Sequence, residues 1–286
     1  MINYGNSVII SPASYWLKMI NPYNPLNLPG LTIRVKMNAG SDAPTVSRAS
    51  VTPVAGQADV YDICTEIPGG RQTNWIDLTR GNLDLIEILG ANVWNSNYTA
   101  CASLAYAFQS TTNLSKVALF DTSSISNMSY AFQGCPNLTS IPLFDTSNVI
   151  NMEGMFQACT HLTTVPLFDT SKVTNMQQMF QSCSALETVP LFDTSNVTNM
   201  EYMFFDCSSL TSVPLFDTSS VTDMSQMFYW CTKVEGGALA LYEQASTQAN
   251  PPTDHTLTFD HCGWNTVIGL VELGYIPQSW GGLQGK

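Results

Sequence analysis

Apolar residues recur along the middle of the chain at a fixed period. The tetrapeptide Phe-Asp-Thr-Ser occurs five times in phase. One full unit, starting at Leu186, reads LETVPLFDTSNVTNMEYMFFDCSS. Self-similarity at a fixed period of this length is typical of solenoids, in which each coil buries its apolar side against its neighbours. The sequence therefore predicts a solenoid of 24-residue coils.

Each coil is predicted to contain a short strand, a turn and a short helix. Leu186, Val189 and Leu191 have the spacing of the strand that lines a leucine-rich repeat. A proline precedes the last leucine, which limits that strand to about three residues. The polar run after Phe192 favours a turn. A Thr-x-x-Glu capping box and apolar residues at i, i+3, i+4 and i+7 then predict the helix, through Thr198, Glu201, Met200, Met203, Phe204 and Cys207.

The repeat weakens at both ends, which divides the chain into three regions. Residues 1–84 show no repeat, and strands predicted over Leu31–Met37 and Val60–Ile63 indicate a small β-rich region. This region either caps the first coil or docks onto a larger assembly. Residues 85–235 form the solenoid, and residues 236–286 form degenerate coils and a cap. The predicted fold class is an α/β repeat: a leucine-rich-repeat-like solenoid with a β-rich N-terminal region.

Five cysteines follow the same period on the predicted inward face. Cysteine at such a position behaves as a small apolar residue. Metal sites need clustered ligands of mixed spacing such as Cys-x-x-Cys, which the chain lacks. We therefore expect buried free thiols at Cys135, Cys159, Cys183, Cys207 and Cys231.

Composition and charge exclude several classes of function. Only 11% of residues are charged, and the formal net charge is −12. That balance argues against binding nucleic acid, which needs a basic face, and against docking on anionic lipid. No apolar run of 18 residues predicts membrane insertion, and no secretion signal follows Met1. Motifs for nucleotide binding, serine hydrolysis or zinc proteolysis are missing, so we expect no enzyme activity and no cofactor.

The phenylalanines of the tetrapeptide are the first candidate binding residues. Strand alternation would point Val189 and Leu191 inward and each phenylalanine outward, as a stacked aromatic ladder suited to sugar or protein. Alternatively, the chain turns directly after the strand and tucks every ring into the core, which is the usual role of an invariant repeat residue. The ladder comprises Phe120, Phe144, Phe168, Phe192 and Phe216.

Two further groups of residues are candidates. The last coils carry more aromatic residues at outward positions than the earlier ones, namely Tyr202, Phe205, Tyr229 and Trp230. They either bind a ligand or are covered by residues 238–286. The aspartates of the tetrapeptide would also stack along the solenoid, and they either bridge calcium or accept hydrogen bonds within their own turns. They are Asp121, Asp145, Asp169, Asp193 and Asp217.

The repeat also resembles a known family. The run Val-Thr-x-Met-x-x-Met-Phe-x-x-Cys-x-x-Leu, followed by Phe-Asp-Thr-Ser, is similar to the BspA-like leucine-rich repeats of bacterial surface proteins. The segments Pro22–Gly30 and Ile276–Gly282 resemble those of repeat proteins encoded by gut bacteriophages. Family membership alone does not fix function.

The resemblance implies a virion structural protein of a tail fibre, tail tip or capsid surface. Its partners would be other virion proteins, a bacterial surface receptor of protein or glycan, or further copies of the chain. The alternatives are a bacterial cell-surface adhesin and an intracellular scaffolding protein.

Overall fold

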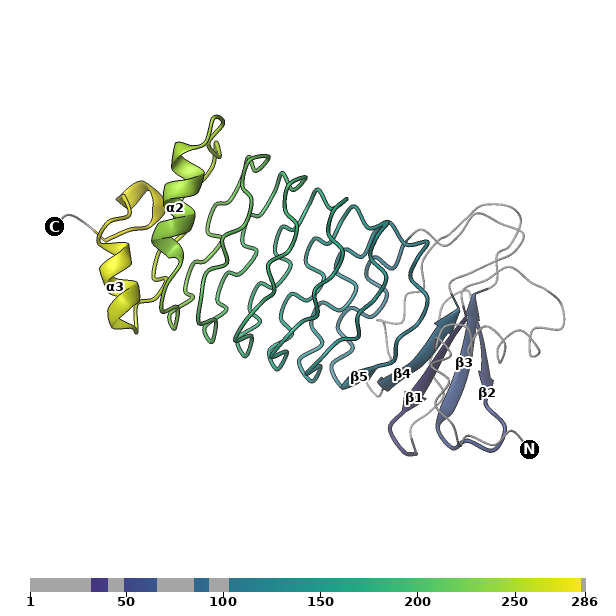
Figure 1. The fold of residues 1–286 in the computed structure, drawn as a ribbon. Coiled ribbons are helices and arrows are strands. Elements are labelled where there is room, and N and C mark those ends of the chain that lie inside the picture. The colour runs from purple at the N-terminus through teal and green to yellow at the C-terminus, as the bar shows by residue number, and fades with distance from the viewer. Residues whose placement is uncertain (1–31, 41–48, 66–84, 93–102, 284–286) are drawn as a thin grey trace, which may run out of the picture.

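A stack of coils dominates the structure, with a sheet at one end and two helices at the other (Figure 1). The structure, a computed structural model, describes residues 32–40, 49–65, 85–92 and 103–283. The segment Pro22–Gly30 lies outside them. One cluster of buried apolar side chains runs from Val35 to Trp280. No helix in the described part of the chain is long and apolar enough to cross a membrane.

The N-terminal sheet has the strand order β2-β3-β1-β4-β5. Strands β1 (Thr32–Met37) and β3 (Val60–Thr65) confirm the two predicted strands, and β2 (Ala49–Pro53) pairs with β3. Strand β4 (Leu85–Asn92) pairs antiparallel with β1 and parallel with β5 (Lys116–Val117). The boundary predicted at residue 84 therefore falls inside one sheet.

The sheet shares its core with the solenoid. Val35 and Met37 of β1 are buried in the same cluster as Leu104 and Phe108 of the first coil. The buried cluster therefore continues from the sheet into the solenoid.

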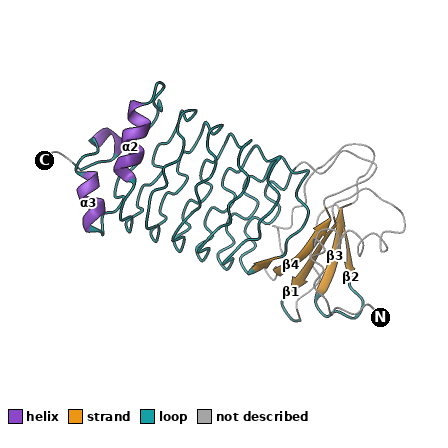
Figure 2. Cartoon of the chain, in the orientation of Figure 1, coloured by secondary structure: helices purple, strands orange, loops and turns teal. Residues whose placement is uncertain are grey.

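The described coils between β5 and α2 contain neither the predicted strand nor the predicted helix (Figure 2). Met200 N, Tyr202 N and Phe204 N donate across to carbonyls of the next coil at 2.8–3.0 Å. Met203 N instead donates back three residues, to Met200 O. Tyr202 and Asp206 have φ values of 55° and 57°, in the left-handed region. These two residues redirect the chain twice per coil, so the backbone bonds to its neighbour rather than winding into a helix.

A polar column joins the coils where the helices were predicted to begin. Isolated parallel bridges link Ser103, Asn127, Asn151, Asn175, Asn199, Asp223 and Asp254 in order. The side chain of Asn199 accepts a hydrogen bond from Glu201 N at 2.8 Å, within its own turn. Thr198 donates to Thr174 O of the preceding coil instead. The predicted capping box is therefore wrong, and the asparagine does the local capping.

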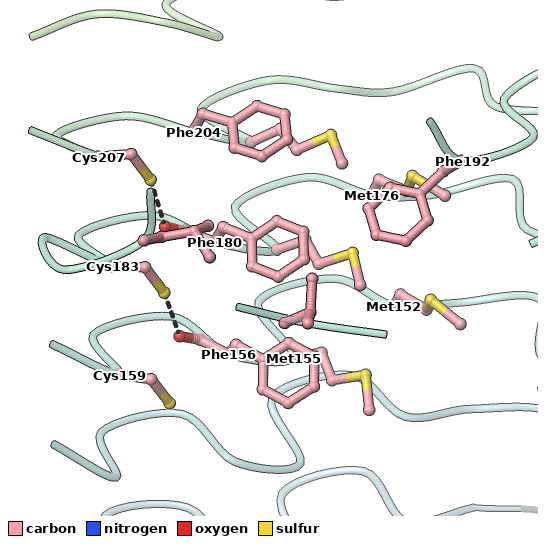
Figure 3. Packing of buried hydrophobic residues seen from close by; sticks show 14 of the residues in the cluster. Met152, Met155, Phe156, Cys159, Met176, Phe180, Cys183, Phe192, Phe204 and Cys207 are labelled. Carbon is pink, nitrogen blue, oxygen red and sulfur yellow. Dashed lines mark hydrogen bonds between the residues drawn. The ribbon is translucent and has the colours of Figure 1, made fainter. Parts of the chain in front are cut away.

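The core consists of columns that repeat one side chain per coil (Figure 3). The ring of Phe180 stacks between those of Phe156 and Phe204, at centroid distances of 5.8 and 5.5 Å. Beside them, Cys183 Sγ donates to Phe156 O at 3.0 Å. Buried free thiols are confirmed at all five predicted positions, and Cys262 adds a sixth among the described residues.

The C-terminal region closes the stack. Helices α2 (Ala238–Thr247) and α3 (Val267–Leu273) and the 3-10 helix η2 (Gln278–Trp280) surround a final irregular coil. Phe259 and Cys262 are buried in this coil and keep the Phe-x-x-Cys spacing of the repeat. Phe259 N donates to Trp280 O at 2.8 Å, which attaches η2 to the last coil.

Candidate binding surfaces

The tetrapeptide phenylalanines are core residues. All five are buried, with at most 3% of each exposed, so the expectation of an outward aromatic ladder is wrong. Phe192 packs 6.2 Å from Phe180, centroid to centroid, and 6.5 Å from Phe216. The structure instead matches the alternative in which each ring turns into the core, at Phe120, Phe144, Phe168, Phe192 and Phe216.

The rest of the tetrapeptide also stabilises the coil. The buried hydroxyl of Thr194 donates to Asp217 O of the next coil at 2.8 Å. Asp193 accepts from the backbone and the hydroxyl of Ser195 at 3.1 and 2.7 Å. The most regular motif in the sequence is therefore occupied by packing and local hydrogen bonds.

A tight turn explains why the inward and outward assignments are reversed. Phe144 N donates to Pro142 O at 2.9 Å, and Phe216 N donates to Pro214 O at 3.0 Å. Each turn places the intervening leucine at its outer tip, because a bond from residue i+2 to residue i reverses the chain around the residue between them. Strand alternation does not apply there.

The exposed leucines at this position of the repeat form a row that sequence reasoning missed. We call it the leucine ridge: Leu143, Leu167, Leu191 and Leu215, which are 57, 60, 60 and 52% exposed. Four successive coils each contribute one member at the same position of the repeat, so the row follows the stacking direction. These leucines recur although they do not contribute to the core. Because exposed apolar patches generally mark binding sites, the row is a candidate binding surface. The proline before each leucine was the available signal.

Exposed carboxylates border the leucine ridge. An aspartate lies two residues after each leucine, at Asp145, Asp169, Asp193 and Asp217, and each is exposed. Hydrogen bonds from the Ser171 hydroxyl and backbone lower the pKa of Asp169, and those from Ser219 lower that of Asp217. The ridge is thus an apolar row with an anionic border, which complements an apolar surface with basic residues around it.

The aspartates accept hydrogen bonds within their own turns, which is the alternative to calcium bridging that the sequence left open. Asp121 Oδ1 accepts from Ser123 N and its hydroxyl at 3.0 and 2.7 Å, and Asp145, Asp169 and Asp193 repeat both bonds. Asp217 accepts from Ser219 N at 2.9 Å. Within the described ranges, no three His, Cys, Asp or Glu side chains gather to hold a metal ion. Calcium binding stays a prediction for these five residues.

The second aromatic group lies near the C-terminal coils and is partly covered. Tyr202 and Phe205 pack edge to face at 5.6 Å, and Phe205 stacks on Tyr229 at 5.2 Å. Trp230, 45% exposed, stacks flat on His261 at 4.7 Å. The segment after residue 238 therefore covers one face of Trp230 while the three other rings remain half-buried. Ligand binding by this group stays a prediction.

Comparisons with known proteins add a family and one distant structure. The family model described as "Mycoplasma protein of unknown function, DUF285" matches residues 102–188 and 163–250, which together span slightly more than half of the chain. A leucine-rich repeat protein from Eubacterium ventriosum is 27% identical, with a TM-score of 0.38. That similarity covers 47% of this chain and 35% of the other. No curated protein matches the chain.

Proposed function

The chain belongs to the DUF285 family, and we propose that it is a non-enzymatic virion protein that attaches to a bacterial surface protein through the leucine ridge. The observation that carries the binding role is the exposure of four leucines in one row, each 52–60% exposed. Their flanking carboxylates support a partner with a basic border. Aliphatic side chains bury well against protein side chains, whereas sugar rings stack on aromatic ones.

The virion location rests on the resemblance of the repeat and its flanking segments to phage-encoded proteins. The stack of coils supports this role, because a solenoid presents an extended binding surface. A cell-surface adhesin would use the ridge in the same way, so location and binding need separate tests.

The binding test uses labelled full-length protein and a panel of intact gut bacteria. We expect Leu167→Glu/Leu191→Glu to weaken binding at least 10-fold, because it places charges in the apolar row. The control is Thr174→Glu/Thr198→Glu, which adds the same charge at two exposed, equivalent positions of the same two repeats. Protease treatment of the cells should abolish binding, whereas periodate treatment should not. Equal binding by the two variants would refute the role of the ridge.

Two further measurements separate the remaining alternatives. Mass spectrometry of purified phage particles should detect the chain, and its absence would overturn the virion location in favour of an adhesin. Binding measured with and without a chelator tests the five aspartates for calcium. Loss of binding on chelation would assign them a metal role.

A further inference from the structure

The C-terminal helix exposes an apolar face that the fold leaves uncovered. The described residues include thirteen large apolar side chains that are substantially exposed, and six lie between residues 264 and 275. We call these six the terminal patch: Trp264, Val267, Ile268, Leu270, Val271 and Tyr275, which are 39–81% exposed.

Four members of the terminal patch lie within α3, on the side of the helix away from its buried residues: Val267, Ile268, Leu270 and Val271. Trp264 and Tyr275 flank the helix at its two ends. Gly269 and Leu273, on the opposite side, are buried against the protein. The exposed side is therefore continuous and faces away from the core.

The surrounding contacts fix α3 in this orientation. A Cβ on Gly269 would lie 2.5 Å from Gly263 Cα, so the two backbones touch. The carboxylate of Glu272 accepts hydrogen bonds from Gly237 N and Leu239 N at 3.3 and 3.2 Å, which joins α3 to the start of α2. The helix cannot rotate to hide its apolar side without breaking these contacts.

A solenoid normally ends in a cap whose outer face is polar, because the last coil has no further neighbour. Here α3 lies at the C-terminal end of the described coils (Figure 1), and its outer face is apolar. With side chains of about 150–250 Å² each, the exposed fractions leave roughly 700 Å² of apolar surface. That area approaches the roughly 800 Å² that each partner contributes to a stable interface.

We propose that the terminal patch is the interface between two copies of this chain. A two-fold interface brings the same surface of both copies together, so it must be self-complementary. The patch is compatible with this requirement, because its six members are uncharged and the one charged residue between 264 and 275, Glu272, has its carboxylate bonded to Gly237 N and Leu239 N. Elsewhere the net charge of −12 repels a second copy. An end-to-end dimer through α3 follows, and it leaves the leucine ridge uncovered.

The first test is the mass of the full chain in solution, by light scattering over a range of concentrations. We expect twice the chain mass of 31.3 kDa. Ile268→Glu/Val271→Glu should raise the dissociation constant of the dimer at least 100-fold, because each interface would bury four unpaired carboxylates. The control is Leu167→Glu/Leu191→Glu, equal in added charge, which should remain dimeric. A monomeric wild-type chain, or a dimer that survives Ile268→Glu/Val271→Glu, would overturn the proposal.

Cross-linking gives a second readout that does not depend on weakening the fold. Ile268→Cys should form a disulfide-linked dimer under mild oxidation, because a two-fold axis brings the two copies of the patch together. Leu191→Cys is the matched control, since the two parent side chains are 56 and 60% exposed. Equal cross-linking of both variants would contradict an interface at α3. Wild-type protein that remains monomeric but binds neutral vesicles would assign the patch to lipid instead.

Discussion

Two neighbouring residues, Leu191 and Phe192, test the inside and outside assignment of every coil. Strand alternation would bury the leucine and expose the ring, whereas the structure leaves Leu191 60% exposed and Phe192 2% exposed. Phe192 lies between Phe168 and Phe216, with centroid distances of 6.4 and 6.5 Å. Replacing it with alanine leaves a cavity in a closely packed column.

The magnitudes follow from burial. Phe192→Ala should lower the free energy of unfolding by about 3–5 kcal/mol, the usual cost of removing a buried aromatic ring. Leu191→Ala should cost less than about 1 kcal/mol, because full burial of leucine contributes only about 1.5–3 kcal/mol and most of this side chain is already in water. Since a solenoid can unfold in parts, the comparison needs two probes.

Urea denaturation followed by circular dichroism and by tryptophan fluorescence supplies those probes. Agreement between the two transitions in each variant justifies converting midpoints into free energies. A Leu191→Ala variant that loses as much stability as Phe192→Ala would refute the assignment of the leucine ridge to the surface.

Three further predictions concern other parts of the coil. Burial raises the pKa of Cys183 from 9.0 to about 12, so between these two pH values its thiol is neutral in the folded protein and ionised in the unfolded chain. The free energy of unfolding should therefore fall by roughly 1.4 kcal/mol per pH unit for each such thiol between pH 9 and pH 12. Alkaline urea titration measures this loss. Gly154→Ala should cost about 1–3 kcal/mol, because a Cβ would lie 2.3 Å from the Tyr130 ring at a φ of +57°; the midpoint of thermal unfolding reports it. Asn199→Ala should cost about 1 kcal/mol by removing the acceptor for Glu201 N, as urea denaturation would measure.

Each of these three has an internal control. Cys183→Ala should reduce the alkaline slope by one thiol, and an unchanged slope would contradict the raised pKa. A Cβ at Gly56 meets nothing within 4 Å, so Gly56→Ala isolates the cost of a positive φ. Thr198→Ala, next to the asparagine, removes an exposed side chain whose hydroxyl donates to Thr174 O, so it should cost less than Asn199→Ala. A larger effect from Thr198→Ala than from Asn199→Ala would restore the capping-box interpretation.

The repeat predicts burial better than it predicts the backbone. Met200, Met203, Phe204 and Cys207 are all fully buried, as their helical spacing indicates. That spacing arises without a helix, because Tyr202 and Asp206 reverse the chain twice and return the same positions to the core. An apolar period indicates which side chains face inward. It does not indicate whether the backbone amides bond within their own coil or to carbonyls of the next one.

Glycine and proline residues in the repeat indicate that the coils lack the predicted strand and helix. Gly134 and Gly154 each occupy one of the two left-handed positions of a coil, in two neighbouring coils, at φ values of 68° and 57°. Glycine is a poor helix residue, so each favours a turn at its position over a helix. Pro142 and Pro214, which lack an amide hydrogen, indicate the turns that expose Leu143 and Leu215. The terminal patch could not be predicted from the sequence, because residues 264–275 lie outside the regular period and their exposure depends on how α3 packs on α2.

The leucine ridge and the terminal patch together predict multivalent attachment. The ridge runs along the coils, whereas the patch lies at their end, so pairing through α3 leaves one ridge free on each copy. Two linked binding surfaces can bind a cell roughly 10²- to 10⁴-fold more tightly than one, without any new contact. Ile268→Glu/Val271→Glu should therefore weaken binding to intact bacteria while leaving the affinity for a single solubilised receptor unchanged. Leu167→Glu/Leu191→Glu should weaken both. Equal losses from the patch variant in the two assays would show that the patch contacts the receptor directly, and would remove the argument for avidity.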